Sequence, residues 1–261
     1  MRATIPMTDE QKFVFDLKGW IAIPGVLTEE ETSLVRDHVL ALKGQEPDNR
    51  YPDARWDMPS QMLLDHPVIV GVLGQIIGAD RSDSSYGFRC ESVVPSVRST
   101  DYEGLDPHGG ASVGALSFNC VNGKLYSGLT RVVWELNPVE EGDGGTLFMS
   151  GSHKANFTIP EAHLAMDSPL FESYTCPAGS VVIFSESVCH AGPLWTNAER
   201  HRISIFSAYG PTQAQYHKTN LSAAVIETMP PKRQTLFRGA WVRDFKNAQA
   251  NDYFSAENVA M

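Results

Sequence analysis

The sequence has few of the features that would place it at a membrane, on a nucleic acid or outside the cell. Its four cysteines show no CxxC spacing and no dense framework, which favours reduced thiols. No apolar run approaches the roughly 18 residues of a membrane span, and the start of the chain lacks a signal-peptide pattern. Basic residues are scarce, at 21 against 31 acidic ones, and the net charge of −10 argues against nucleic-acid and anionic-membrane binding. We therefore expect a cytoplasmic protein without nucleic-acid or membrane partners.

Internal repeats and low-complexity linkers are also absent. A chain of 261 residues is long enough for two average domains, but β-rich folds of this length often form one. Because no linker divides the chain, we expect a single domain over residues 1–261.

The first third of the chain carries helix signals. Thr8 precedes three polar residues as a helix cap, and Thr28 with Glu31 forms a capping box before an apolar spacing of three and four. We expect helices over residues 8–17, 28–42 and 68–77, and a short strand over residues 20–23.

The residue pattern changes near Tyr86, where short strand-like runs alternate with turns rich in Gly, Pro and Asp. Helices followed by many short strands predict a mostly β protein, with a closed β structure and the N-terminal helices packed on its outside. The expected strands cover residues 86–94, 114–119, 128–136, 146–149, 179–184 and 202–209. The tail after Tyr216 is mixed, and residues 237–245 could return to pack on the barrel.

Three segments in order resemble the phytanoyl-CoA dioxygenase family. Residues 19–31 look like its N-terminal strand and helix. Residues 136–154, with a Glu-Gly-Asp-Gly-Gly turn and a Gly-Ser-His-Lys ending, look like its mid-barrel hairpin. Residues 179–209 look like its closing strands. The resemblance covers about residues 10–215 and leaves 216–261 as a C-terminal extension.

The resemblance implies an enzyme with a double-stranded β-helix (jelly-roll, cupin-like) fold that binds Fe(II) and 2-oxoglutarate. In this family iron is held by His-x-Asp and a distal His, which leaves positions for 2-oxoglutarate and O2. His108 matches the first histidine and His190 the distal one. Arg202, twelve residues after His190, matches the arginine that grips the far carboxylate of 2-oxoglutarate, as a planar guanidinium can.

Other residues compete for these roles or assist them. Arg200 has the same strand parity as Arg202 but a poorer spacing, and Thr130 or Tyr126 could help to hold the co-substrate. His153 lies in a Gly-Ser-His turn and is expected to be structural. His201 alternates to the face opposite Arg202, and we assign it no role.

One departure from the family concerns the iron ligand itself. The carboxylate should lie two residues after His108, and that position is Gly110. The sequence thereby resembles the non-haem iron halogenases, in which the small residue leaves a coordination position for a halide such as chloride. Halogenation of an aliphatic C–H is the reaction that this interpretation implies.

Two alternatives remain open. Asp106 precedes His108 by two residues, and an extended backbone, favoured by Pro107, would place both side chains on one face. Asp106 could then be the third ligand of an ordinary hydroxylase. Alternatively, the chain is a non-catalytic relative or a cupin-like binding protein, although a simple cupin would not need Arg202.

The substrate is expected to be a small organic molecule, oxidised with O2. Loops at residues 55–59 and 89–102 would recognise it, and plausible contacts are Trp56, Arg89, Arg98 and Trp195. The two tryptophans are more often packing residues. The protein is expected to be a monomer or a homodimer.

Overall fold

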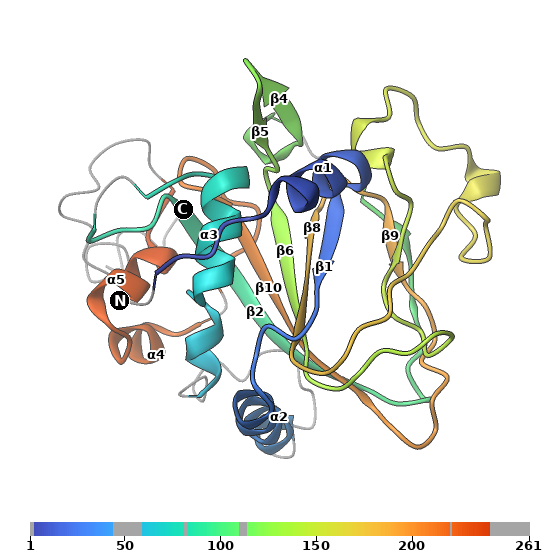
Figure 1. The fold of residues 1–261 in the computed structure, drawn as a ribbon, viewed down its shortest axis with the longest axis horizontal. Helices are drawn as coiled ribbons and strands as arrows, with labels where there is room; N and C mark the ends of the chain where they lie inside the picture. Colours follow the sequence, from blue (N-terminus) through green and yellow to red (C-terminus); the bar gives the residue numbers. More distant parts are fainter. Residues whose placement is uncertain (1–2, 44–58, 81–82, 110–113, 220, 241–261) are drawn as a thin grey trace.

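The computed structural model describes residues 3–43, 59–80, 83–109, 114–219 and 221–240. A main β-sheet crosses the centre of the molecule (Figure 1). Helices lie against one side of it, and β9 with several long connections lies on the other side. None of the helices in the described part is long and apolar enough to cross a membrane.

The helices begin and end where the sequence signals predict. Helix α1 (Asp9–Lys18) starts at a capping box between Thr8 and Gln11, and Gly19 ends it in the left-handed conformation, with φ of 80°. Helix α2 (Glu29–Lys43) has three acids in its first turn, which favourably oppose the helix dipole. Helix α3 (Pro67–Ile76) begins with proline and is apolar almost throughout. Short helices α4 (Ala223–Glu227) and α5 (Pro231–Gln234) follow the last strand.

Five antiparallel strands form the main sheet in the order β1-β8-β6-β10-β2. Its two longest strands lie at one edge, and the N-terminal strand lies at the other. The strands are β1 (Trp20–Ile23), β2 (Phe88–Arg98), β6 (Thr130–Glu135), β8 (Ser180–Ser185) and β10 (Arg202–Pro211). The order is far from the sequence order, so distant segments share each face.

A smaller sheet has the order β3-β9-β7. Its strands are short: β3 (Leu105–His108), β7 (Leu147–Phe148) and β9 (His190–Gly192). A separate hairpin joins β4 (Asn119–Val121) to β5 (Lys124–Tyr126) through Asn122 and Gly123. Both turn residues have positive φ, 52° and 74°, as a tight two-residue hairpin requires.

The main sheet buries both of its faces. The face toward the helices carries residues such as Val132, Trp134 and Ile205 in the larger apolar cluster. The face toward the small sheet carries Val133 and Phe184, which pack with other residues of a smaller aromatic cluster. Period-two alternation along each strand produces this division. The mostly β class with helices on the outside is therefore confirmed.

Of two further expectations, one is wrong and the other is met as far as the structure describes the chain. The predicted strand over residues 114–119 is wrong where it is described, because Gly114–Leu116 forms a 3-10 turn and β4 begins only at Asn119. The tail does return to the sheet up to residue 240: Leu236 and Phe237 are buried in the larger cluster, and Arg238 donates to the carbonyl of Tyr86. Residues 241–261 lie outside the described part.

Candidate metal and carboxylate site

His108 and His190, far apart in the sequence, are direct cross-strand partners. They face each other in the β3–β9 pairing, and their ring centroids are 4.2 Å apart. Phe184 lies 4.7 Å from the His190 ring, so an apolar wall closes one side. The two predicted ligand histidines are thus brought together on the small sheet, where His190 is buried and His108 exposed.

Both imidazoles are oriented by the backbone. Nδ1 of His108 lies 2.7 Å from the carbonyl oxygen of Asp106, and Nδ1 of His190 lies 2.8 Å from that of Val188. A carbonyl accepts, so each Nδ1 carries the proton and each Nε2 keeps its lone pair. Burial lowers the pKa of His190 to about 4, which keeps it neutral at pH 7. Two Nε2 atoms pre-oriented in this way suit a divalent transition metal.

A carboxylate that the sequence reasoning missed lies beside this pair. Oε2 of Glu186 is 3.8 Å from Nε2 of His190, and its other oxygen accepts from Nε of Arg131. Burial by itself would raise the pKa of Glu186, but the charge and the hydrogen bond of Arg131 oppose it, and the pKa is lowered. The signal available in the sequence was an acid directly after the apolar run of β8, four residues before a predicted ligand.

Arg202 is fully buried on the face toward the small sheet, and its guanidinium already has protein partners. Nη2 donates to Glu135 at 2.6 Å, to the Tyr174 hydroxyl at 2.8 Å and to Thr146 at 3.1 Å. Its Nη1, however, is buried with no hydrogen-bond partner among the described residues. Nothing in the sequence pointed to the partner Glu135, because it lies on a different strand.

Arg98, which the sequence analysis named only as a substrate contact, has more free donors. It pairs with Arg202 across β2 and β10, and its Nε and Nη1 are buried without partners in the described part. Burial and the neighbouring Arg202 lower its pKa to about 10, so it stays charged. A Cβ on Gly192 would lie 3.1 Å from Nη1 of Arg98, which places this guanidinium over β9, two residues beyond His190.

These groups form a cluster of donors that an anion would satisfy. Both guanidinium groups lie over the ring of Phe206. The distance from Cζ to the ring centroid is 5.4 Å for Arg98 and 5.5 Å for Arg202. The buried hydroxyl of Ser204, on the same strand face, also has no partner among the described residues. Two arginines against one carboxylate, Glu135, leave one unit of positive charge. Unpaired buried donors are costly, and one carboxylate would satisfy them.

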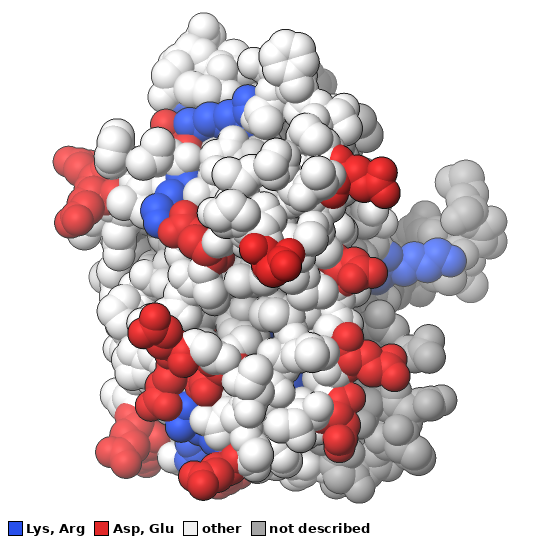
Figure 2. Space-filling model, turned by 90° about the vertical axis from the view of Figure 1, so that its right-hand side faces the viewer, with Lys and Arg blue, Asp and Glu red and all other residues white. Residues whose placement is uncertain are grey.

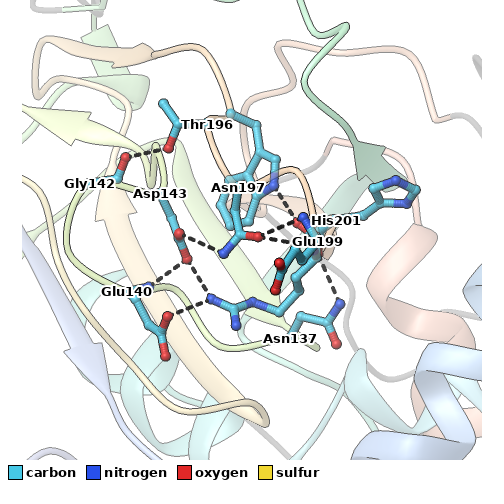
Figure 3. A network of polar contacts seen from close by, with 10 residues as sticks. Asn137, Glu140, Gly142, Asp143, Thr196, Asn197, Glu199 and His201 are labelled. Carbon is cyan, nitrogen blue, oxygen red and sulfur yellow. Dashed lines mark hydrogen bonds and ion pairs between the residues drawn. The ribbon is translucent and has the colours of Figure 1, made fainter.

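Arg200 does not belong to this cluster. Its Nη2 donates to Asp143 at 2.7 Å and to Glu140 at 3.0 Å (Figure 3), in a network that joins the turn before β7 to the loop before β10. Trp195 belongs to the same network, because its indole donates to the carbonyl of Arg200 at 2.6 Å. Both residues therefore hold loops together, and the predicted rival for the carboxylate clamp is engaged elsewhere.

The remaining predicted site residues lie apart from the histidines. Thr130 bonds Ser127 at 2.8 Å and alternates to the face opposite Arg131. Tyr126 lies in the β4–β5 hairpin, beneath the Lys124 ammonium. The side chain of Asp106 is exposed, while its backbone carbonyl holds His108. Gly110 lies outside the described residues.

The other predicted substrate contacts divide in the same way. Arg89 is buried, and its guanidinium donates to the side chain of Gln215 and to the carbonyl oxygens of Ala214 and Arg238. It therefore fastens the segment after β10 to the sheet. Trp56 lies outside the described residues. His153, expected to be structural, is buried and bonds the carbonyl of Asp16 at 3.0 Å.

The face on the side of β9 is rich in acidic side chains and poor in basic ones (Figure 2). Acidic groups surround a shallow depression in this view, which looks onto the side of the molecule that carries the small sheet. This side of the molecule thus has the sign of the net charge of the chain.

Comparisons with known proteins give a likeness of fold. No protein-family model and no curated protein matches the sequence. HygX from Streptomyces hygroscopicus, with nickel and 2-oxoglutarate bound, superposes with a TM-score of 0.68 at 22% identity, over 95% of this chain and 99% of that one. Its complex that also contains hygromycin B gives 0.66 at 22% identity, over 95% and 100%.

The epimerase SnoN, in complex with Fe3+, alpha ketoglutarate and nogalamycin RO, gives a TM-score of 0.57 at 18% identity, over 79% of this chain and 84% of that one. At such identities the likeness concerns the fold alone. The chain therefore has the fold of non-haem enzymes that bind iron or nickel together with 2-oxoglutarate.

Proposed function

We propose that this protein is a non-haem iron, 2-oxoglutarate-dependent oxidoreductase with a double-stranded β-helix fold, acting on an aliphatic C–H of a small organic molecule. The observation that carries the proposal is the cross-strand pair of His108 and His190, with both Nδ1 atoms bonded to backbone carbonyls. A pair held in this way presents two Nε2 ligands and no competing donor. Iron would supply the O2 chemistry when bound.

The residues present fit both groups. Nε2 of His108 and of His190 would hold the metal. Arg98, the free Nη1 of Arg202 and the hydroxyl of Ser204 would hold the far carboxylate of 2-oxoglutarate. Two arginines share the role of binding this carboxylate, because Nε and Nη2 of Arg202 already donate to Glu135. Phe206 would support the co-substrate chain between the metal and the clamp.

The charge of the molecule narrows the substrate class. The net charge of −10 and the acidic side of the molecule that carries β9 disfavour polyanions such as acyl-coenzyme A esters and favour neutral or cationic substrates. Hygromycin B and nogalamycin RO, bound to the two neighbours, are natural products, and neither name denotes a coenzyme A ester. We infer that a small, neutral or cationic natural product is the substrate.

The outcome of the reaction depends on the third ligand. Gly110 in place of the usual carboxylate supports a halide position and halogenase-type chemistry with chloride. Asp106 as a substitute ligand would support hydroxylation. Arg98 and Arg202 have buried donor atoms without partners in the described part. Such donors cost free energy of folding, and a relative that binds no ligand would gain nothing from retaining them.

The test is anaerobic titration with Fe(II) and 2-oxoglutarate, followed by the weak visible charge-transfer band, and then succinate formation in air. We expect the band in the wild type and its loss in His108→Ala and His190→Ala. Arg200→Gln serves as a matched control and should retain the band. A folded wild type that gives no band, or an unchanged band in either histidine variant, would refute the proposal.

A further inference from the structure

Glu186 is a largely buried carboxylate beside His190. The residue follows β8 directly, and a tight turn fixes it: its N–H donates to the carbonyl of Leu129 at 2.9 Å, and that of Val188 donates to Ser185 at 3.0 Å. Its side chain is only 13% exposed. The same turn supplies the Val188 carbonyl that orients His190, so carboxylate and imidazole are positioned by one structural unit.

The spacing fits two ligands of one ion. Oε2 of Glu186 and Nε2 of His190 are 3.8 Å apart, which is too long for a hydrogen bond. Two atoms that are each about 2.1 Å from a metal lie roughly 3 to 4 Å apart, depending on the angle between the bonds. Nε2 is also the nitrogen that the backbone leaves free. The pair therefore leaves room for an ion between its two atoms.

Glu186 is held from behind by a polar chain. Its Oε1 accepts from Nε of Arg131, and Nη2 of Arg131 lies 3.3 Å from Nε2 of His217. Nδ1 of His217 in turn lies 3.4 Å from Oε2 of the buried Glu91. Ligating carboxylates are commonly supported in this way by hydrogen bonds from residues behind them. One oxygen is thus occupied by Arg131, and the other is directed toward His190.

The rival acids are less well placed. Asp106 has an exposed side chain, and Gly110 has no side chain to offer. Within the described residues, no three His, Cys, Asp or Glu side chains already meet around one point. A modest rotation of the Glu186 side chain toward the histidines would therefore accompany metal binding.

We propose that Glu186 is the third protein ligand of the metal and replaces the carboxylate missing at Gly110, with Arg131 as its positioning residue. This inference rests on the proposed function. It restores two histidines and one carboxylate, so the remaining positions serve 2-oxoglutarate and O2. It also makes oxygenation the expected reaction, because the position that a halide would take is filled.

The test uses Co(II) as the probe and measures its dissociation constant by calorimetry and its visible spectrum, without 2-oxoglutarate or turnover. Glu186→Gln keeps the shape and removes the charge, and we expect roughly 10–100-fold weaker binding and a changed spectrum. The matched control, Asp106→Asn, should bind as the wild type does. Wild-type affinity in Glu186→Gln, or a loss in Asp106→Asn alone, would overturn the inference.

A second variant separates ligation from folding. Glu186→Gln leaves Arg131 without its carboxylate, so Arg131→Gln/Glu186→Gln removes both charges together. We expect the double variant to bind Co(II) as weakly as Glu186→Gln, and recovery of wild-type affinity would contradict the role as a ligand. His190→Ala distinguishes the two proposals: if it too binds Co(II) normally, the metal site itself is refuted. If only His190→Ala loses binding, the metal site stands and Glu186 is not its ligand.

Discussion

Arg98 and Arg202 are direct partners across the antiparallel pairing of β2 with β10. Two cations in register repel each other, and within the described ranges Arg202 has a carboxylate partner, Glu135, while Arg98 has none. The protein therefore retains an unfavourable arrangement in its interior. A bound carboxylate would relieve it, which connects the stability of the fold to the presence of the co-substrate.

Arg98→Gln should weaken the binding of 2-oxoglutarate. A hydrogen bond to a charged group contributes about 1.5–3 kcal/mol, so we expect the dissociation constant to rise roughly 10–100-fold. The measurement is 2-oxoglutarate titration of the metal-loaded protein, with Arg200→Gln as the control. Because the substitution removes the repulsion with Arg202, thermal unfolding should occur at the same or a higher temperature. An unchanged dissociation constant would show that Arg98 is not part of the clamp.

Glu135→Gln should destabilise the fold strongly. It leaves Arg202 buried without its charge partner, and breaking a buried pair in this way costs about 3–5 kcal/mol. Tyr174→Phe is the matched variant, because it removes the hydroxyl that accepts from Arg202 and donates to Glu135 but leaves the ion pair in place, so it should cost less, about 1.5–3 kcal/mol. Urea unfolding of both variants checks the difference, and equal losses would contradict the paired arrangement.

Gly192→Ala should act on the site rather than on the fold. Gly192 has an ordinary backbone conformation, but a Cβ there would lie 2.9 Å from the Tyr102 hydroxyl and 3.1 Å from Nη1 of Arg98. The added methyl group would push the guanidinium away from β9. We expect weaker 2-oxoglutarate binding with little change in the unfolding temperature. Gly142→Ala, where no atom lies within 4 Å but φ is 84°, should show the opposite pattern.

His153 should make the fold sensitive to acid. Burial lowers its pKa, so the unfolded chain takes up the proton more readily than the folded one as the pH falls below about 6.5. The free energy of unfolding therefore decreases as the pH falls through this range. Well above pH 6.5, His153 is neutral in both states and does not change the stability with pH. His153→Gln, which can still donate to the Asp16 carbonyl, should reduce the loss between pH 7 and 5.5. Unfolding free energies of both proteins at these two values check the sign.

Much of the fold was accessible from the sequence because local signals are strong in it. The capping residues Thr8 and Thr28 fixed two helix starts, and the apolar runs of β6, β8 and β10 fixed three central strands. Strands β3 and β9 have four and three residues, too few for any period to show. The residue pattern predicted no strand at either place, and the resemblance drew attention only to the histidines His108 and His190 that these strands carry.

The polar partners of the site were harder to foresee. Glu135 and Arg202 meet because β6 and β10 are neighbours, and strand order cannot be read from local pattern. Glu186 was overlooked because an acid after a strand is usually a solvated turn residue. Burial, which decides whether such a charge needs a partner, is a property of the assembled fold.

The pairing of β3 with β9 joins segments that are remote along the chain, and the pairing of β1 with β8 joins segments that are still farther apart. Contacts of such long sequence separation form slowly, because large loops must close first. The histidine pair therefore comes into existence only when the small sheet has closed. A metal that binds this pair would recognise the completed structure and none of its earlier partly folded forms, so uptake of Co(II) during refolding should follow the slowest phase.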